Sequence, residues 1–236
     1  MSTSEKIVLI DGDQIAYLCA FSCETEIEWD EDTISLTTSK ADLRKALDFQ
    51  INKAKRETNT DTVWVALSSS TNFRKELYKS YKANRTARKP LGLNYCKEYL
   101  TQEYQAEDHE GLEADDLIGI WAANRYDRVI WATDKDYLTV PCMLYRNNQL
   151  LRISEKEADH NLRVQTLSGD TADNYKGAKG FGEKTAKKWL DTHGDTWESV
   201  YAAFKSKGQT KDEYVTNAKL ARISRSFDDI NWYPDE

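Results

Sequence analysis

The stretch KIVLIDGD, residues 6–13, predicts the architecture of the chain. Its apolar run ends at Asp11, as expected of a short strand buried inside a sheet. Two similar runs follow, TVWVAL at 62–67 and RVIWAT at 128–133, and the second ends directly before Asp134. Buried strands that alternate with helical segments are typical of a mostly parallel sheet covered by helices.

The spacing of apolar residues outside these runs predicts the remaining elements. We expect helices at 14–22, 40–57, about 91–104 and 111–126, an acidic hairpin within 23–39, and a hairpin that turns at Asn147-Asn148. From about residue 154 the pattern is helical, with one glycine-rich interruption. We therefore predict an α/β core in residues 1–153 and a small helical domain in residues 154–236.

Composition and charge narrow the class of protein. The chain has 236 residues, 39% of them hydrophobic, and a formal net charge of −7. It begins without a signal-peptide pattern, and no apolar window is long enough to span a membrane, so we expect a cytoplasmic protein. Its four cysteines form no Cys-x-x-Cys pair and it has three histidines, so reduced thiols are expected and a zinc site is disfavoured.

Acidic residues stand where the predicted strands end and where one helix begins. In an open α/β sheet the functional crevice lies outside the carboxyl ends of the strands, so these residues should meet there. Adjacent helical residues point about 100° apart, so neighbouring acids on a helix can face two different ions. The candidates are Asp11, Asp13, Glu113, Asp115, Asp116, Asp134 and Asp136, with Asp170 and Asp173 before the glycine-rich loop.

Cations are needed to stabilise a cluster of acidic side chains that lie close together. Two like charges ~4 Å apart repel by roughly 4 kcal/mol at an effective dielectric constant near 20. Oxygen-only ligands suit Mg²⁺, for which Mn²⁺ can substitute, and two such ions can activate water and stabilise the leaving oxygen of a phosphodiester. A single Asp is more often a turn or helix-cap residue, but several acids in matched positions favour metal binding.

The segment NYKGAKGFGEKTAKKWL, residues 174–190, has glycines spaced as in a loop that enters a helix. Glycines let the backbone approach a phosphate, and the first amides of a helix attract anions. An ordinary packing loop between helices is the alternative. The expected backbone contacts are Lys176, Gly177, Lys179, Gly180, Gly182, Lys184 and Thr185.

The segment at 73–89 carries seven basic side chains and one acidic one, interleaved with aromatic rings. Basic and aromatic residues together are typical of a path for single-stranded nucleic acid. A solvated helix face is the alternative. The expected DNA contacts here are Arg74, Lys75 and Tyr81.

Taken in order, these motifs resemble the phage and bacterial 5′-to-3′ exonuclease and flap-endonuclease family. The resemblance rests on LIDGD (9–13), YKANR (81–85), GLEADD (111–116), TDKD (133–136), GDTADN (169–174) and GAKGFGEKTA (177–186). It implies a PIN-like nuclease core with a helical arch over about 73–95, followed by a helix–three-turn–helix domain that grips duplex DNA and can bind K⁺. It implies cleavage from the 5′ ends of duplex DNA, with 5′ flaps and RNA–DNA hybrids as further substrates, by a monomer in the cytoplasm of a bacterial host.

The resemblance also implies roles for individual residues. Asp11, Glu113 and Asp115 would hold the first metal ion, and Asp116, Asp134, Asp136, Asp170 and Asp173 would hold or orient the second. Lys82 and Arg85 would reach the scissile phosphate. The family usually has an aspartate after the second core strand, where this chain has Ser69.

Two other functions remain open from the sequence. A haloacid-dehalogenase-like phosphatase also has an Asp-x-Asp pair after an apolar strand, which Asp11 and Asp13 imitate, but YKANR has no role in its mechanism. A non-catalytic DNA-binding relative would have lost metal ligands, and Ser69 is one such change.

Overall fold

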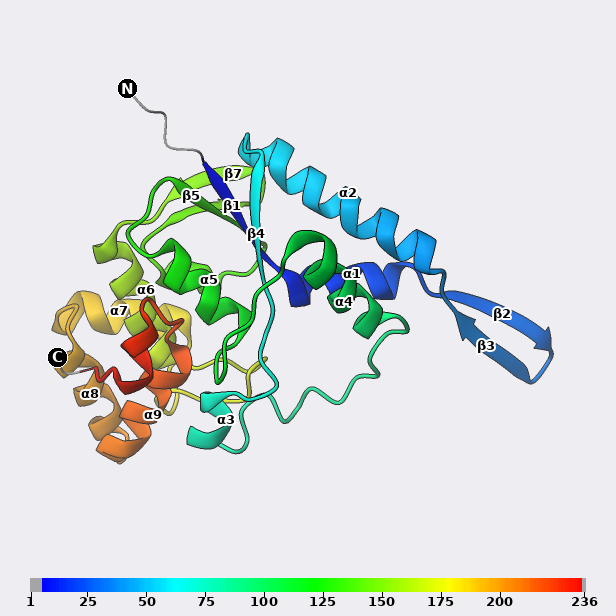
Figure 1. Ribbon diagram of the computed structural model, residues 1–236. Coiled ribbons are helices and arrows are strands. Elements are labelled where there is room, and N and C mark those ends of the chain that lie inside the picture. Colours follow the sequence, from blue (N-terminus) through cyan, green and yellow to red (C-terminus); the bar gives the residue numbers. More distant parts are fainter. Residues whose placement is uncertain (1–5, 235–236) are drawn as a thin grey trace, which may run out of the picture.

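The structure is a computed structural model that describes residues 6–234. At its centre lies a five-stranded sheet in the order β4–β1–β5–β6–β7, parallel except for the last strand (Figure 1). The strands are β1 (Ile7–Asp11), β4 (Thr62–Ala66), β5 (Arg128–Trp131), β6 (Met143–Arg146) and β7 (Gln149–Arg152). The predicted α/β architecture is therefore confirmed. Within the described residues no helix is both long and apolar enough to cross a membrane.

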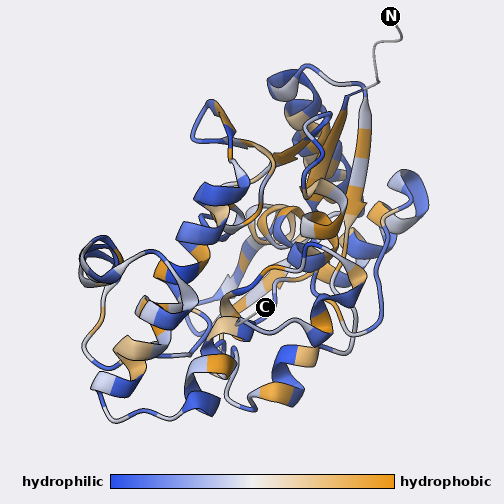
Figure 2. Cartoon of the chain, turned by 90° about the vertical axis from the view of Figure 1, so that its left-hand side faces the viewer, coloured by the Kyte–Doolittle hydropathy of each residue, from blue (hydrophilic) through white to orange (hydrophobic). Residues whose placement is uncertain are grey.

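One face of the sheet is covered by α1 (Gly12–Ser22), α2 (Lys40–Thr58) and α4 (Leu93–Tyr104). Val8 and Ile10 of β1 point into this layer, where they pack with Leu47 and Leu100 in one hydrophobic core. The strands of the sheet are mainly hydrophobic, whereas the outward-facing sides of the helices are mainly hydrophilic (Figure 2). Successive side chains of β1 enter hydrophobic cores on opposite faces of the sheet. Both faces are buried, which explains why the sequence of this strand is apolar without interruption.

The other face is covered by α5 (Ala114–Ala122) and part of α6 (Glu155–Ser168). Leu9 of β1 and Ile130 of β5 pack here against Leu117 and Ile118 of α5. The start of α1 needs Gly12 because a Cβ atom there would lie 2.8 Å from the carbonyl oxygen of Ala66. This close approach brings Asp11 and the end of β4 to the same edge of the sheet.

The C-terminal part is helical, as predicted. It contains α6, α7 (Glu183–His193), α8 (Trp197–Ser206), α9 (Lys211–Ala221) and the short 3-10 helix η2 (Phe227–Asn231). These helices lie on the opposite side of the molecule from the hairpin β2 (Thr25–Asp30) and β3 (Thr33–Thr37), which projects outward (Figure 1).

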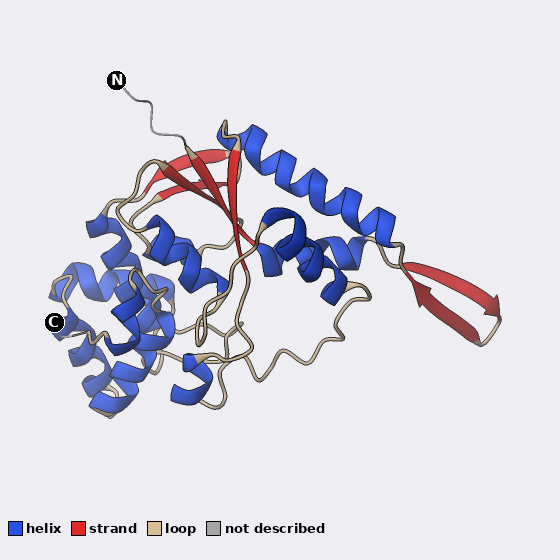
Figure 3. Cartoon of the chain, in the orientation of Figure 1, coloured by secondary structure: helices blue, strands red, loops and turns tan. Residues whose placement is uncertain are grey.

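The helical arch expected over about 73–95 is wrong for most of its length. Only α3 (Phe73–Leu77) is helical before α4 begins, and the chain between them runs as turns and loop (Figure 3). Lys82 has a φ of 55°, in the left-handed region that interrupts a right-handed helix. The segment is held instead by contacts with distant residues, so tertiary contacts replace helical hydrogen bonds.

Candidate active site

The acidic residues that follow β1 and β5 lie at the carboxyl edge of the sheet, as the parallel strand order requires. Asp11 ends β1 and caps α1, where its Oδ1 accepts a hydrogen bond from the Gln14 amide at 3.0 Å. Asp134 follows β5, and its Oδ1 accepts from the Asp136 amide at 2.9 Å. Gln14 Nε2 donates to Thr133 Oγ1 at 3.1 Å, which links the first turn of α1 to the segment that follows β5.

The helix α5 brings its first turn to the same edge. Glu113 is its N-cap residue and shares a capping box with Asp116. Asp115 Oδ1 accepts a hydrogen bond at 2.8 Å from the hydroxyl of Tyr137, which belongs to the short 3-10 helix η1 (Asp136–Thr139). Tyr137 thus holds Asp115 in position beside the residues that follow β5.

Burial and neighbouring negative charges raise the pKa of three of these carboxyls. Burial and the neighbouring Asp115 raise the pKa of Asp11 well above its usual value. Burial raises the pKa of Asp115 to about 6. Burial, followed by Asp134 and Asp170, raises the pKa of Asp136 to about 7. Shifts of this kind mark sites where like charges converge, so these acids form the electronegative centre of the site.

Asp116 does not belong to that centre, so of the two roles expected for it, holding or orienting a metal ion, the structure contradicts the first. Its carboxylate is fully buried and paired with both terminal nitrogens of Arg74, at 2.6 and 2.7 Å. It also accepts from the Ser224 amide at 3.0 Å. Arg74 is 3% exposed, so the expectation that it contacts DNA is corrected as well. The two residues form a structural ion pair beneath the site.

Tyr81 and Lys82 of the basic segment reach into the acidic site. The Tyr81 hydroxyl donates to Glu113 Oε2 at 2.9 Å and to Asp173 Oδ2 at 3.0 Å. Tyr81 is 4% exposed, so the expected stacking of DNA bases on its ring is corrected to a role in holding two carboxylates. Lys82 Nζ donates to Glu113 Oε1 at 2.6 Å and lies 3.8 Å from Asp173 Oδ2.

Glu113 and Asp173 are thus surrounded by cations. Burial opposes ionisation of Glu113, but Arg74 and Lys82 outweigh it and hold the pKa of this carboxyl below its usual value. Arg85 Nη2 donates to Asp173 Oδ1 at 2.6 Å, and the Arg85 side chain is more than half exposed. The structure therefore places both expected phosphate-contacting residues, Lys82 and Arg85, beside the acidic cluster.

Asp170 stands at the edge of the cluster. Its Oδ1 accepts from the Ala172 amide at 2.7 Å in the turn before the glycine-rich loop. Its charge contributes to the raised pKa of Asp136. The turn is tight because Gly169 and Gly177 lie back to back, and a Cβ on Gly169 would meet the Gly177 nitrogen at 2.5 Å. This contact fixes Asp170 relative to the loop.

Asp13 and the serines after β4 make a separate set of contacts. Asp13 Oδ2 accepts from the Ser68 amide at 2.9 Å, and its other oxygen pairs with Lys97 of α4. Ser68 Oγ accepts from the Ala114 amide at 3.0 Å, at the start of α5. Ser69, at the position where the resemblance leads us to expect an aspartate, makes side-chain contacts with Thr71.

The donor chemistry of the cluster fits a hard divalent cation. All the candidate donors are carboxylate oxygens, and Asp136 Oδ1 is buried without a hydrogen-bond partner. In residues 6–234, however, no three Asp, Glu, His or Cys side chains are arranged as a ready ligand set. Lys82, Arg85 and Lys97 are paired with Glu113, Asp173 and Asp13, so each of these carboxylates would have to exchange that partner in order to act as a metal ligand.

The glycine-rich loop leads into α7, whose N-cap residue Gly182 provides no side-chain cap for the first amides. Lys176, Lys179, Gly180, Gly182, Lys184 and Thr185 are exposed there, as is Lys75 in α3. Gly177 differs, because it is buried and its amide donates to Asn217 Oδ1 at 3.0 Å. The expectation that this amide meets a phosphate is corrected.

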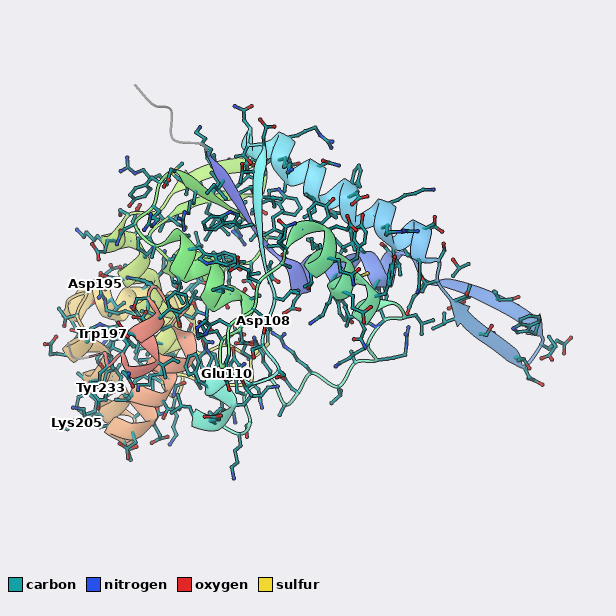
Figure 4. The ribbon with its side chains drawn as sticks, viewed as in Figure 1. Asp108, Glu110, Asp195, Trp197, Lys205 and Tyr233 are labelled. Carbon is teal, nitrogen blue, oxygen red and sulfur yellow. The ribbon has the colours of Figure 1, made fainter. Side chains whose placement is uncertain are left out.

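Several residues of the site are not among those predicted from the sequence. Tyr137 and Tyr175 are both buried beside the acids, and burial raises the pKa of each hydroxyl. Their signal in the sequence is an aromatic residue directly after a predicted acidic ligand or in the same turn. Outside the site, the exposed loop before α5 carries two further acidic residues, Asp108 and Glu110 (Figure 4).

Comparison with known proteins decides the family. The model of the 5′-3′ exonuclease N-terminal resolvase-like domain matches residues 6–166, and that of the 5′-3′ exonuclease C-terminal SAM fold matches residues 157–232. The chain belongs to the 5′-3′ exonuclease family. Its enzymatic class is therefore that of a nuclease, a phosphodiester hydrolase, and the phosphatase and the non-catalytic alternatives are not favoured.

The relatives of this exonuclease include phage enzymes. It is 28% identical to the exodeoxyribonuclease of Enterobacteria phage T3, and the match covers 98% of this chain and 91% of the relative. It is 27% identical to the exonuclease of Escherichia phage T7, with the same coverage. Its fold is similar to that of a bacteriophage T5 flap endonuclease solved with DNA and metal ions, with a TM-score of 0.62, 15% identity, and 91% and 88% of the two chains covered.

The two family models overlap within α6. Our domain boundary between residues 153 and 154 lies just before this helix and stays a prediction. The exonuclease core and the helical part share α6, since its Ala158 packs in the sheet core while its Val164 packs among α7, α8 and α9.

Proposed function

We propose that this exonuclease hydrolyses DNA phosphodiesters from the 5′ ends of duplexes, and also acts on 5′ flaps and RNA–DNA hybrids, with two divalent metal ions. The observation that carries the proposal is the convergence of four acids at one edge of the sheet, Asp11, Asp115, Asp134 and Asp136. Lys82 of the basic segment reaches the same place, where it pairs with Glu113. The T5 relative, which was solved with DNA and metal ions, supports the same substrate and cofactor class.

The proposed cofactor is Mg²⁺, for which Mn²⁺ can substitute. Asp11, Glu113 and Asp115 would hold the first ion, and Asp134, Asp136, Asp170 and Asp173 would hold or orient the second. Two such ions supply an activated water and stabilise the leaving oxygen. Asp13 lies beside this set and is paired with Lys97. We also propose K⁺ at the glycine-rich loop, a monomeric state and a location in the cytoplasm of a bacterial host.

The protein side chains contribute binding and charge. Lys82 and Arg85, now paired with Glu113 and Asp173, would transfer their hydrogen bonds to the scissile phosphate and stabilise the charge that develops there. Tyr81 and Tyr137 hold Glu113 and Asp115 in orientation. The uncapped start of α7, with Lys184 and Thr185, would contact the duplex backbone.

The test uses a duplex and a 5′-flap substrate, each prepared once with a 5′ label and once with a 3′ label. With Mg²⁺, we expect early release of the 5′ label as short products, and no release after chelation. Asp134→Asn should lose nearly all turnover but shift DNA in a gel as the unaltered protein does, because it removes a carboxylate and leaves the basic surface intact. Cleavage that survives chelation, or that starts at 3′ ends, would contradict the proposal.

A further inference from the structure

The glycine-rich loop is shaped by α9 and the turn before it. Two backbone amides of the loop donate hydrogen bonds to side chains from outside the loop. The Gly177 amide donates to Asn217 Oδ1 at 3.0 Å, and the Lys179 amide donates to Gln209 Oε1 at 2.8 Å. Gln209 Nε2 returns a bond of 3.3 Å to the Gly177 carbonyl oxygen. One side of the loop is thus fixed by two amide side chains.

These two amide side chains are themselves held in place. Gln209 is 8% exposed, and its Nε2 lies 3.5 Å from Glu213 Oε1. Asn217 Nδ2 donates to the Glu213 carbonyl oxygen at 2.7 Å, one turn earlier in α9. Each side-chain amide is therefore oriented with its oxygen toward the loop. A side chain fixed by a second hydrogen bond can impose its geometry on the backbone that it binds.

In the part of the chain that the structure describes, the opposite side of the loop is exposed. Gly180 and Gly182 are exposed, and a Cβ atom at either position would meet no atom within 4 Å. The first amides of α7 have no side-chain cap. The loop therefore has an inner side bound to Gln209 and Asn217 and an outer side on which a phosphate can lie against backbone N–H groups.

We propose that Gln209 and Asn217 are positioning residues that hold the glycine-rich loop in the shape that binds duplex phosphates. This inference rests on the duplex contact assigned to the loop under the proposed function. The two residues contact the loop backbone rather than DNA. Their removal leaves the loop cations in place but lets the loop relax, so that fewer of its amides and lysines meet phosphates at once.

The experiment measures duplex affinity without chemistry, by fluorescence anisotropy of a labelled duplex in EDTA at several KCl concentrations. Asn217→Ala and Gln209→Ala should each bind about tenfold more weakly, equivalent to ~1.4 kcal/mol. The slope of log K against log salt should become shallower by about 0.9 for each phosphate that the loop no longer reaches. In steady-state cleavage, KM for the duplex should rise while kcat stays within about twofold.

Thr216, the neighbour of Asn217, supplies matched controls because its side chain makes no hydrogen bond to the loop in the described part of the chain. Thr216→Ala should bind as the unaltered protein does. Asn217→Asp keeps an acceptor for the Gly177 amide but adds a negative charge, and Thr216→Asp adds the same charge one residue away while Asn217 stays unchanged. Equal affinity of these two aspartate variants, both well above that of Asn217→Ala, would support positioning through the acceptor oxygen.

Three results separate the possible failures. If Lys184→Ala weakens duplex binding while Asn217→Ala and Gln209→Ala do not, the positioning role is overturned and the loop contact stands. If Lys184→Ala leaves the salt slope unchanged, the duplex contact of the loop is itself wrong. If Asn217→Ala and Gln209→Ala lower thermal stability but neither affinity nor slope, the two residues are structural only, and the inference fails.

Discussion

Arg74 and Asp116 form a buried bidentate ion pair, with nitrogen–oxygen distances of 2.6 and 2.7 Å and at most 3% of either side chain exposed. Arg74 also donates to the Arg222 carbonyl oxygen at 2.5 Å. The pair therefore ties α3 and α5 to the segment that follows α9. Its position explains why two residues with the chemistry of a DNA contact and a metal ligand do neither here.

Asp116→Asn should destabilise the fold, because it leaves the Arg74 guanidinium buried without its counter-ion. Breaking a buried pair by removing one partner costs about 3–5 kcal/mol. Thermal unfolding monitored by circular dichroism measures the effect. Asp134→Asn, at an exposed position, is the control and should change stability by less than about 0.5 kcal/mol. An Asp116→Asn protein of normal stability that has lost turnover would instead restore Asp116 as a metal ligand.

Lys82→Ala should reduce turnover more than affinity. Its ammonium lies 2.6 Å from Glu113 Oε1, at the acidic centre, where it can stabilise charge that develops on a phosphate. We expect kcat to fall roughly 10²-fold or more, the scale found when one such donor is removed. Single-turnover cleavage of a 5′-labelled duplex checks this, with Lys45→Ala at an exposed position of α2, outside the site, as the control. If KM alone rose, Lys82 would be a binding contact only.

The raised pKa values of Asp136, about 7, and Asp115, about 6, predict a pH dependence of stability in the protein without metal. Between pH ~4 and ~7 the folded protein retains protons that the unfolded chain has released, so the free energy of unfolding falls as pH rises through this window. Calorimetry in a chelating buffer should show Tm decreasing by a few degrees.

Two further measurements, one with substituted proteins and one with Mg²⁺, test the origin of that pH dependence. Asp136→Asn should flatten the decline in Tm, whereas Asp108→Asn, in the exposed loop before α5, should not. Mg²⁺ should raise Tm more at pH 7 than at pH 5, since the ion binds ionised carboxylates and competes with protons. A Tm that is independent of pH across this range in the unaltered protein would show that the carboxyls do not face one another closely.

Ser68 and Ser69 should differ in effect although they are neighbours. Ser68→Ala removes the acceptor for the Ala114 amide at the start of α5 and should cost about 1 kcal/mol of stability. Ser69→Ala should cost little, and Ser69→Asp should lower the Mg²⁺ concentration for half-maximal rate by adding a carboxylate at the site edge. Thermal unfolding measures the stability of the three variants, and a Mg²⁺ titration of their cleavage rates measures the metal requirement. A Ser69→Ala protein as inactive as Asp134→Asn would mean that the serine itself is essential.

The sequence by itself determined the core strands and the position of most acidic residues. Apolar runs with period and length suited to buried strands are local signals, and parallel strands bring their carboxyl ends to one edge whatever the details of packing. Asp11, Asp134 and Asp136 were therefore predictable from their places after KIVLI and RVIWAT. Asn147 and Asn148, with φ values of 51° and 60°, likewise turn the β6–β7 hairpin as their chemistry predicts.

Only the tertiary structure decided which charged side chains are free. Arg74 meets Asp116 across 42 positions and Tyr81 meets Asp173 across 92, and no local pattern states such pairings. Contacts of Tyr81, Lys82 and Arg85 with distant acids hold an irregular segment in place of a helical arch. The contacts of Gln209 and Asn217 bind one side of the glycine-rich loop and leave the other side exposed. The physical reason is that a residue's type sets what it can bind, whereas burial and the partners brought to it by the fold set what it does bind.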